Sequence, residues 1–126
     1  MARFYGSITL LDDVTVLTAQ RAQSPVIDVG AYSDILFHWA LTGGGSGSWE
    51  VFISSLRPDD PRITGDPNLA TNLFWVPRDP VIPDPDGVLE RAYGDIGDAV
   101  IRSLVVRYTA TTDTTGLTLL AGYTSR

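Results

Sequence analysis

Apolar and polar residues alternate with a period of two along most of the chain. Residues 34–41 show this pattern most clearly, and residues 48–54 repeat it. The period is typical of a strand with one buried face, because successive side chains of a strand point to opposite sides. A glycine-rich stretch, residues 43–47, separates the two segments. We therefore expect an antiparallel pair joined by this loop.

Further strands are expected on both sides of this pair. The N-terminal alternation covers residues 4–10 and 14–19, and the turn-like Asp12–Asp13 between them predicts a hairpin or two consecutive short strands. The other predicted strands are residues 26–29, 72–76, 99–110, which are rich in β-branched residues, and 116–123. No stretch shows a helical period with caps, although residues 95–99 suffice for one helical turn.

Together these segments predict an all-β fold, an antiparallel β-sandwich or jelly roll of about seven to eight strands. The chain has 126 residues, which is the length of a single domain, and we assign residues 1–126 to one. The predicted inward faces are made of large apolar residues: Ile35, Phe37, Trp39, Trp49, Val51, Ile53, Leu104, Val106, Tyr108, Leu117 and Leu119.

Residues 56–91 interrupt the alternation. Seven of the eight prolines lie in this segment, which is also rich in aspartate, and only residues 72–76 in it are expected to form a strand. Ordered loops of this length usually carry function or form an interface. Because proline restricts the free chain, such a segment loses little entropy on binding. We expect this excursion to lie along a partner.

Composition excludes several classes of site and partner. The chain has no cysteine, so it forms neither disulfides nor thiolate metal sites. Its formal net charge is −6, which argues against a nucleic-acid binder that follows phosphates. No apolar run reaches the length of a membrane span, and the N-terminus has no signal-peptide pattern. We expect a soluble protein with neither nucleic-acid nor membrane partners.

Candidate catalytic and metal-binding residues are few. His38 is the single histidine, and no serine is marked as a nucleophile beside it. Residues 84–87 with Glu90 faintly resemble a calcium loop, but ligands are missing at the required spacing, so turn formation by aspartate explains them better. Thirteen aspartates allow no pair to be assigned to hydrolysis. We expect no enzymatic activity, no cofactor and no metal.

Aromatic residues are more informative about partners. Phe74 and Trp75 are adjacent, so a strand would point them to opposite faces, and Phe52 lies opposite the predicted inward face of its own strand. Either these rings form an interface, or the proline-rich excursion covers them. The candidate partner contacts are aromatic or basic residues: Arg3, Phe4, Tyr5, Phe52, Phe74, Trp75 and Arg78.

Four segments of the chain carry a resemblance to a known class of protein: residues 29–37, 49–53, 101–111 and 116–123. Together they resemble small β-sandwich structural proteins of tailed bacteriophages, especially capsid decoration (cement) proteins. The shared features are an arginine-containing strand, a Thr/Asp/Gly turn and a final C-terminal strand. The resemblance covers about two thirds of the chain and omits the proline-rich excursion.

The resemblance implies a virion structural protein without an active site or a cofactor. Such a protein is soluble in the host cytoplasm before assembly and then binds the outer surface of the head. It often forms a homotrimer, and its partners are the major capsid protein and neighbouring copies of itself. A position in the neck or tail is a variant of this hypothesis. The alternative is a carbohydrate- or receptor-binding module, for example of a tail fibre, with Phe74, Trp75 and Tyr93 as its aromatic contacts.

Overall fold

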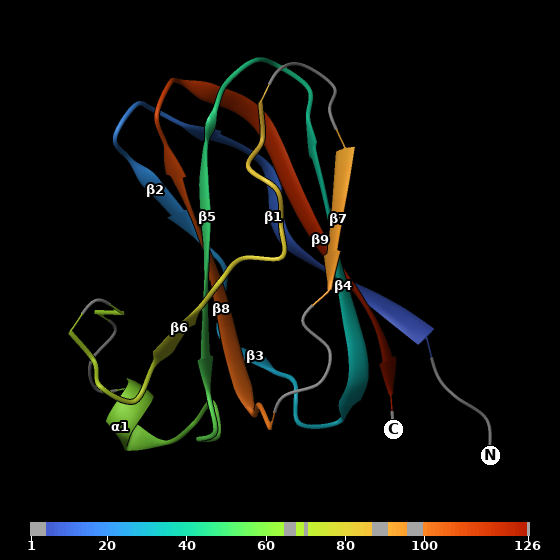
Figure 1. The fold of residues 1–126 in the computed structure, drawn as a ribbon, viewed down its shortest axis with the longest axis vertical. Helices are drawn as coiled ribbons and strands as arrows, with labels where there is room; N and C mark the ends of the chain where they lie inside the picture. The colour runs from blue at the N-terminus through green and yellow to red at the C-terminus, as the bar shows by residue number, and fades with distance from the viewer. Residues whose placement is uncertain (1–4, 65–67, 70, 87–90, 96–99, 126) are drawn as a thin grey trace.

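Two antiparallel β-sheets face each other and enclose the core (Figure 1). The structure is a computed structural model that describes residues 5–64, 68–69, 71–86, 91–95 and 100–125. Sheet A has the order β1 (Tyr5–Val16), β9 (Thr114–Ser125), β4 (Tyr32–Leu41) and β7 (Arg91–Asp95). Sheet B has the order β2 (Arg21–Gln23), β8 (Ser103–Ala110), β5 (Gly47–Ser54) and β6 (Val76–Arg78), and β3 (Ile27–Asp28) also pairs with β8. A single helical turn, α1 (Pro61–Thr64), lies beside sheet B.

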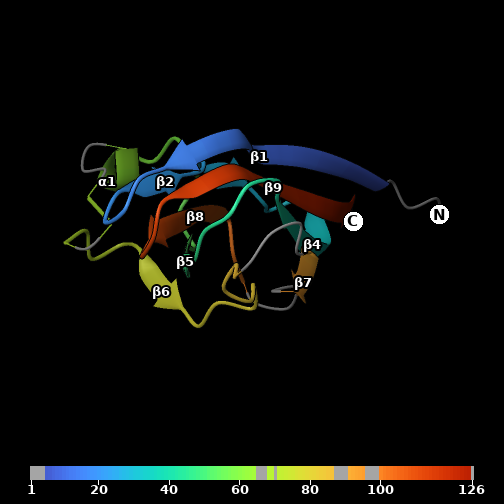
Figure 2. The same ribbon diagram turned by 90° about the horizontal axis from the view of Figure 1, so that it is seen from above.

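The strand order is that of a jelly roll. β2 and β3 both pair with β8, and between them Ser24 keeps contact with the same strand through its backbone and its hydroxyl. When β2 and β3 are counted as one interrupted strand, every connection except β5 to β6 crosses from one sheet to the other. Figure 2 shows the same arrangement from above, with β1 and β9 running across the view. The expected all-β fold is confirmed, and the topology selects the jelly roll.

The core lies between the two sheets and uses the predicted inward faces. The predicted faces of β4, β8 and β9 are buried throughout, and in β5 Trp49 and Val51 are buried while Ile53 is half-buried. The Tyr108 hydroxyl is buried too, and it forms a hydrogen bond of 2.7 Å with Thr114 Oγ1. This bond satisfies a polar group that would otherwise be left unpaired in the core.

The predicted break at Asp12–Asp13 is wrong, because residues 5–16 form one strand. The strand carries a bulge where its register against β9 shifts between Leu11 and Val14. Asp13 takes a φ of 49° there, and its amide donates to Thr118 Oγ1 at 3.1 Å. Aspartate tolerates this left-handed conformation better than most residues, so the sequence signal of a turn marks a bulge instead.

The predicted pairing of residues 34–41 with 48–54 is also wrong. β4 pairs with β7 and β9, whereas β5 pairs with β6 and β8 in the opposite sheet. The glycine-rich loop therefore crosses the top of the sandwich, and Gly45 has a φ of 138° within it. Alternation shows that both strands have an apolar face, but both sheets bury such a face.

The strand expected at residues 72–76 is displaced. Residues 72–75 form a turn, and the strand is β6, which begins at Val76. Pro77 has no amide proton and sits in β6 at the edge of sheet B, where that proton is not needed. Neither β7 nor α1 was predicted. The helical turn expected at residues 95–99 has its first residue at the end of β7, and residues 96–99 lie outside the described part.

The proline-rich excursion packs largely on its own domain. Its first part, with α1, covers the outer face of sheet B, and its later part runs across the open side of the sandwich between β6 and β7 (yellow in Figures 1 and 2). Ile82 from this later part joins the main core and is only 2% exposed. Asp84 Oδ1 accepts a hydrogen bond of 3.3 Å from the Trp49 amide. The expectation of an arm laid along a partner is therefore corrected for these parts.

Candidate functional site

A small second core forms where the excursion meets the outer face of sheet B. Phe52 and Val105 project from the sheet, and they pack with Ile63, Leu69 and Trp75 from the excursion. Phe52 is 4% and Trp75 is 5% exposed. Neither ring is available at the surface, so their expected role as partner contacts is corrected. Of the two explanations for these aromatics, burial under the excursion applies to both.

The turn that carries Trp75 inward is held by hydrogen bonds around Asn72. The buried side chain of Asn72 donates from Nδ2 to the Arg62 carbonyl at 3.0 Å and accepts from the Phe74 amide at 2.9 Å. Its own amide donates to the Asn68 carbonyl, and its carbonyl accepts from the Trp75 amide. The turn is thus tied to α1 and to the second core, and its outward residues are held in place.

Three apolar side chains near this turn face outward. Leu73 is 91%, Phe74 46% and Val76 54% exposed, and we call these three residues the 73–76 patch. The Arg62 guanidinium lies 5.5 Å from the centroid of the Phe74 ring. Arg62 is in turn held by Asp60, and these hydrogen bonds lower the pKa of the Asp60 carboxyl to about 2. An exposed apolar group on an ordered support is typical of a contact surface.

The remaining predicted contacts are scattered. Arg3 and Phe4 lie outside the described residues. Tyr5 is 78% exposed at the start of β1, on the side of the molecule opposite α1 (Figures 1 and 2). Arg78 is half-buried on β6, where it lies across from Val51. The structure therefore separates Tyr5 from Phe74 and Arg78, and the predicted residues do not form one site.

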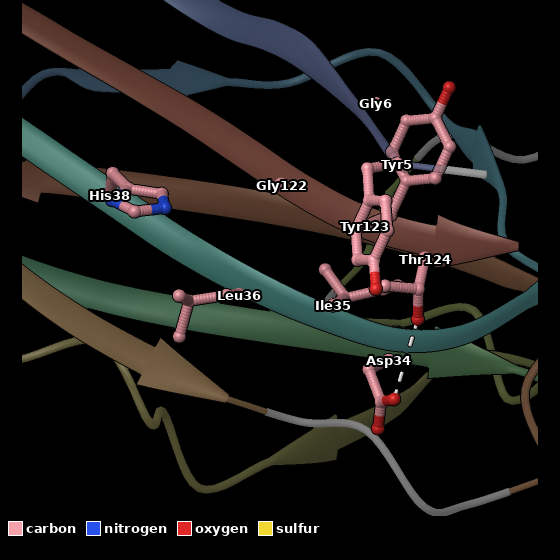
Figure 3. A pocket seen from close by; sticks show the side chains of 9 residues that line it. All are labelled: Tyr5, Gly6, Asp34, Ile35, Leu36, His38, Gly122, Tyr123 and Thr124. Atoms are coloured by element: carbon pink, nitrogen blue, oxygen red, sulfur yellow. Dashed lines mark hydrogen bonds between the residues drawn. The ribbon is translucent and has the colours of Figure 1, made fainter. Parts of the chain in front are cut away.

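A shallow groove on the outer face of sheet A was not predicted. It has a volume of about 330 Å³, and Figure 3 shows the nine residues that line it: Tyr5, Gly6, Asp34, Ile35, Leu36, His38, Gly122, Tyr123 and Thr124. Strand register places Gly122 beside Leu36, with His38 one row away and Asp34 one row away in the other direction. The sequence signal for the groove is a glycine on the outward side of β9, between Leu120 and Thr124.

The structure brings few chemical groups together. Among the described residues, no three side chains of the His, Cys, Asp or Glu types are grouped so as to hold a metal ion. No helix within the described ranges is long and apolar enough to span a bilayer. His38 is half-buried on the outer face of sheet A and lines the groove.

Comparison with solved structures finds the same fold in another protein. The crystal structure of SPBc2 prophage-derived protein YomS superposes with a TM-score of 0.53, over 99% of this chain and 96% of that chain. The two sequences are 11% identical, so the likeness shows a shared fold. No protein-family model matches the sequence. No curated protein matches it either.

Proposed function

We propose that this chain is a non-enzymatic structural protein of a tailed bacteriophage, and that it decorates the outer surface of the head. The observation that carries the proposal is the fold, which is shared over almost the full length of both chains with a prophage-derived protein. Jelly rolls are also common among viral capsid proteins. The sequence resemblance to decoration proteins points the same way.

The proposed contact with the head is the 73–76 patch. Leu73 projects from a turn that is held by the hydrogen bonds of Asn72, so little backbone conformational entropy remains to be lost on binding. A small apolar centre inside a polar surround is the usual arrangement of an interface hot spot. In this proposal the major capsid protein covers the patch, and copies of the chain meet around a threefold position on the head.

Sedimentation with purified heads that lack the protein tests both parts of the proposal. Leu73→Asp places a charge at the centre of the patch, and Val100→Asp makes the same change at an equally exposed residue, since the two side chains are 91% and 89% exposed. We expect the wild type and Val100→Asp to bind heads saturably. Leu73→Asp should bind at least about tenfold more weakly. Burial of one leucine side chain contributes about 1.5 to 3 kcal/mol, and a loss of about 1.4 kcal/mol lowers the affinity tenfold.

The possible outcomes test the decorating role and the choice of the 73–76 patch as the contact separately. If Leu73→Asp and the wild type bind heads equally, the patch is the wrong contact while the decorating role stands. If the folded wild type does not sediment with heads at all, the decorating role is wrong. Circular dichroism and a thermal melt of both variants establish that each is folded before the comparison.

A further inference from the structure

On the outer face of sheet A, the side chains of neighbouring strands lie in rows across the sheet, and one position in these rows has no side chain. Tyr5 and Asp34 both lie beside Thr124, and Ser7 and Leu36 both lie beside Gly122. In the next row Thr9 and His38 flank Leu120. The middle row therefore has no side chain at its centre, and the hollow lies between the Tyr5 ring and His38 (Figure 3).

The hollow is open because of the missing side chain at Gly122. A Cβ atom built on Gly122 would meet His38 Nε2 at 3.6 Å and the Leu36 carbonyl oxygen at 3.8 Å, which are ordinary contacts. The backbone there does not require glycine, since its φ is outside the left-handed region. Packing and conformation would both accept a Cβ atom at this position, so neither explains the glycine.

We propose that this groove binds the pyranose ring of a neutral sugar. The ring has apolar C–H faces and a rim of hydroxyls, and the groove offers surfaces for both. Tyr5, a residue that is 78% exposed, presents its aromatic ring, and Leu36 is 38% exposed beside the hollow. Aromatic side chains with a polar end suit ligands that are apolar on one side and hydrated on the other.

The polar groups of the groove lie at its rim, where sugar hydroxyls would reach them. Asp34 is exposed, and its Oδ2 accepts a hydrogen bond of 3.4 Å from Thr124 Oγ1, as the dashed line in Figure 3 marks. A carboxylate accepts several hydrogen bonds and donates none, so Asp34 is suited to accept hydrogen bonds from sugar hydroxyls. His38 bounds the opposite end of the hollow.

Charge selects the class of sugar. Asp34 is the only acidic residue among the nine that line the groove, none of the nine is lysine or arginine, and the whole chain has a formal net charge of −6. A uronic or sialic acid would bring a second carboxylate beside Asp34 in a site lined by neither lysine nor arginine. Like charges brought together on binding disfavour the complex, so neutral hexoses are the expected ligands.

The groove and the 73–76 patch lie on opposite sides of the molecule. α1, whose Arg62 carbonyl holds the turn of the patch, and the start of β1, which carries Tyr5, lie on opposite sides, left and right, in both Figure 1 and Figure 2. A copy attached through the patch would leave the groove facing away from its support. Sugar binding therefore goes beyond the proposed decorating role and does not depend on it.

The test is an NMR titration of the ¹⁵N-labelled protein with the methyl glycosides of glucose, galactose and mannose. Methyl glucuronide serves as the anionic control because it has the same ring as the glucoside. We expect at least one neutral glycoside to shift the amide signals of Gly122, Leu36 and Thr124 saturably within the millimolar range, which is ordinary for one weakly held ring. The glucuronide should bind at least about tenfold more weakly, which is about 1.4 kcal/mol.

Three variants and one control connect the binding to the groove. Tyr5→Ala removes the exposed ring and should weaken binding about tenfold, whereas Tyr5→Phe keeps the ring and should retain most of it. Gly122→Val fills the hollow and should abolish binding, while valine suits a strand and keeps the fold. Val100→Ala removes an apolar side chain that is 89% exposed and does not line the groove, so it should bind sugar as the wild type does.

Clear results would overturn the proposal. These are the absence of saturable shifts with all three neutral glycosides up to tens of millimolar, or equal binding by the wild type and a folded Gly122→Val. Tighter binding of the glucuronide than of the glucoside would overturn the choice of neutral sugars. Because the assay contains no heads, none of these results bears on the decorating role.

Discussion

Arg107 shows how a charged residue is accommodated on the covered face of sheet B. It is only 8% exposed, and its guanidinium lies 5.1 Å from the centroid of the Phe52 ring. Nε and Nη2 donate to the two carboxylate oxygens of Glu50, each at 3.0 Å. Glu50 lies directly opposite on β5. Since a guanidinium stays charged at any ordinary pH, the folded state needs this carboxylate.

Replacing Glu50 should therefore destabilise the protein. We expect Glu50→Gln to lower the free energy of unfolding by about 2 kcal/mol, below the range for a fully buried pair because the Glu50 side chain is 42% exposed. Urea denaturation measures the change. Asp59→Asn is the control, because Asp59 and Arg57 pair at 3.7 Å with side chains that are 81% and 69% exposed. That change should cost less than about 0.5 kcal/mol. Equal losses in the two variants would contradict the prediction.

Single residues also show where the sequence was informative about sites. Phe74 and Tyr5 were expected at the surface and are exposed, whereas Phe52 and Trp75 were expected as contacts and are buried. Alternation correctly put Phe52 on the face of its strand opposite the main core. It carries no information on whether a distant segment covers that face, and here the excursion does.

At the scale of elements, the first part of the excursion, up to Trp75, is a cover with its own small core. Trp75 packs with Ile63 and Leu69 from the excursion and with Phe52 and Val105 from sheet B. The main core is made of a different set of residues, which lie between the two sheets. The cover should therefore open without unfolding the sandwich, as locally packed units often do.

Trp75→Ala should open the cover selectively. Loss of this buried ring removes about 3 kcal/mol of packing from the small core. In hydrogen exchange we expect the backbone amides at positions 72, 74 and 75 to exchange faster, while those of β4 and β9 are unchanged. Val100→Ala, at an exposed position outside the small core, should alter neither group. Faster exchange of β4 and β9 to the same extent would show that the cover and the sandwich unfold as one unit.

Four strands at the sheet edges carry features that disfavour pairing with another chain. β1 has its bulge at Asp12–Asp13, β6 contains Pro77, and β2 and β3 are short and separated by a segment that includes Pro25. Bulges, charges and prolines are the usual means by which natural sheets avoid joining edge to edge. Assembly of copies is therefore expected to use faces and loops rather than continuous sheets.

At the scale of the whole molecule, the proposal predicts an assembly. We expect light scattering behind a sizing column to give three times the chain mass of 13.6 kDa, because a head-decorating protein that sits on threefold positions presents three copies of its contact at once. The measurement is repeated over a dilution series. A mass of one chain throughout would contradict a trimer in solution and confine trimer formation to the head surface.

The sequence by itself determined the all-β class and the inward faces of the strands. Alternation with period two shows which side of each strand is apolar, and burial of Phe37, Trp49, Val106 and Leu119 confirms it. Composition likewise determined that no disulfide or thiolate site exists. These properties are local or compositional, so no knowledge of distant contacts is needed to derive them.

Only the tertiary structure decided which strands are neighbours and which surfaces are covered. Both sheets bury the same kind of apolar face, so alternation alone does not indicate that β4 and β5 lie in opposite sheets. The same holds for the excursion, whose return onto Phe52 is a contact between segments far apart in the sequence. The groove at Gly122 is likewise formed by residues of β1, β4 and β9 together, because strand register brings them into adjacent rows.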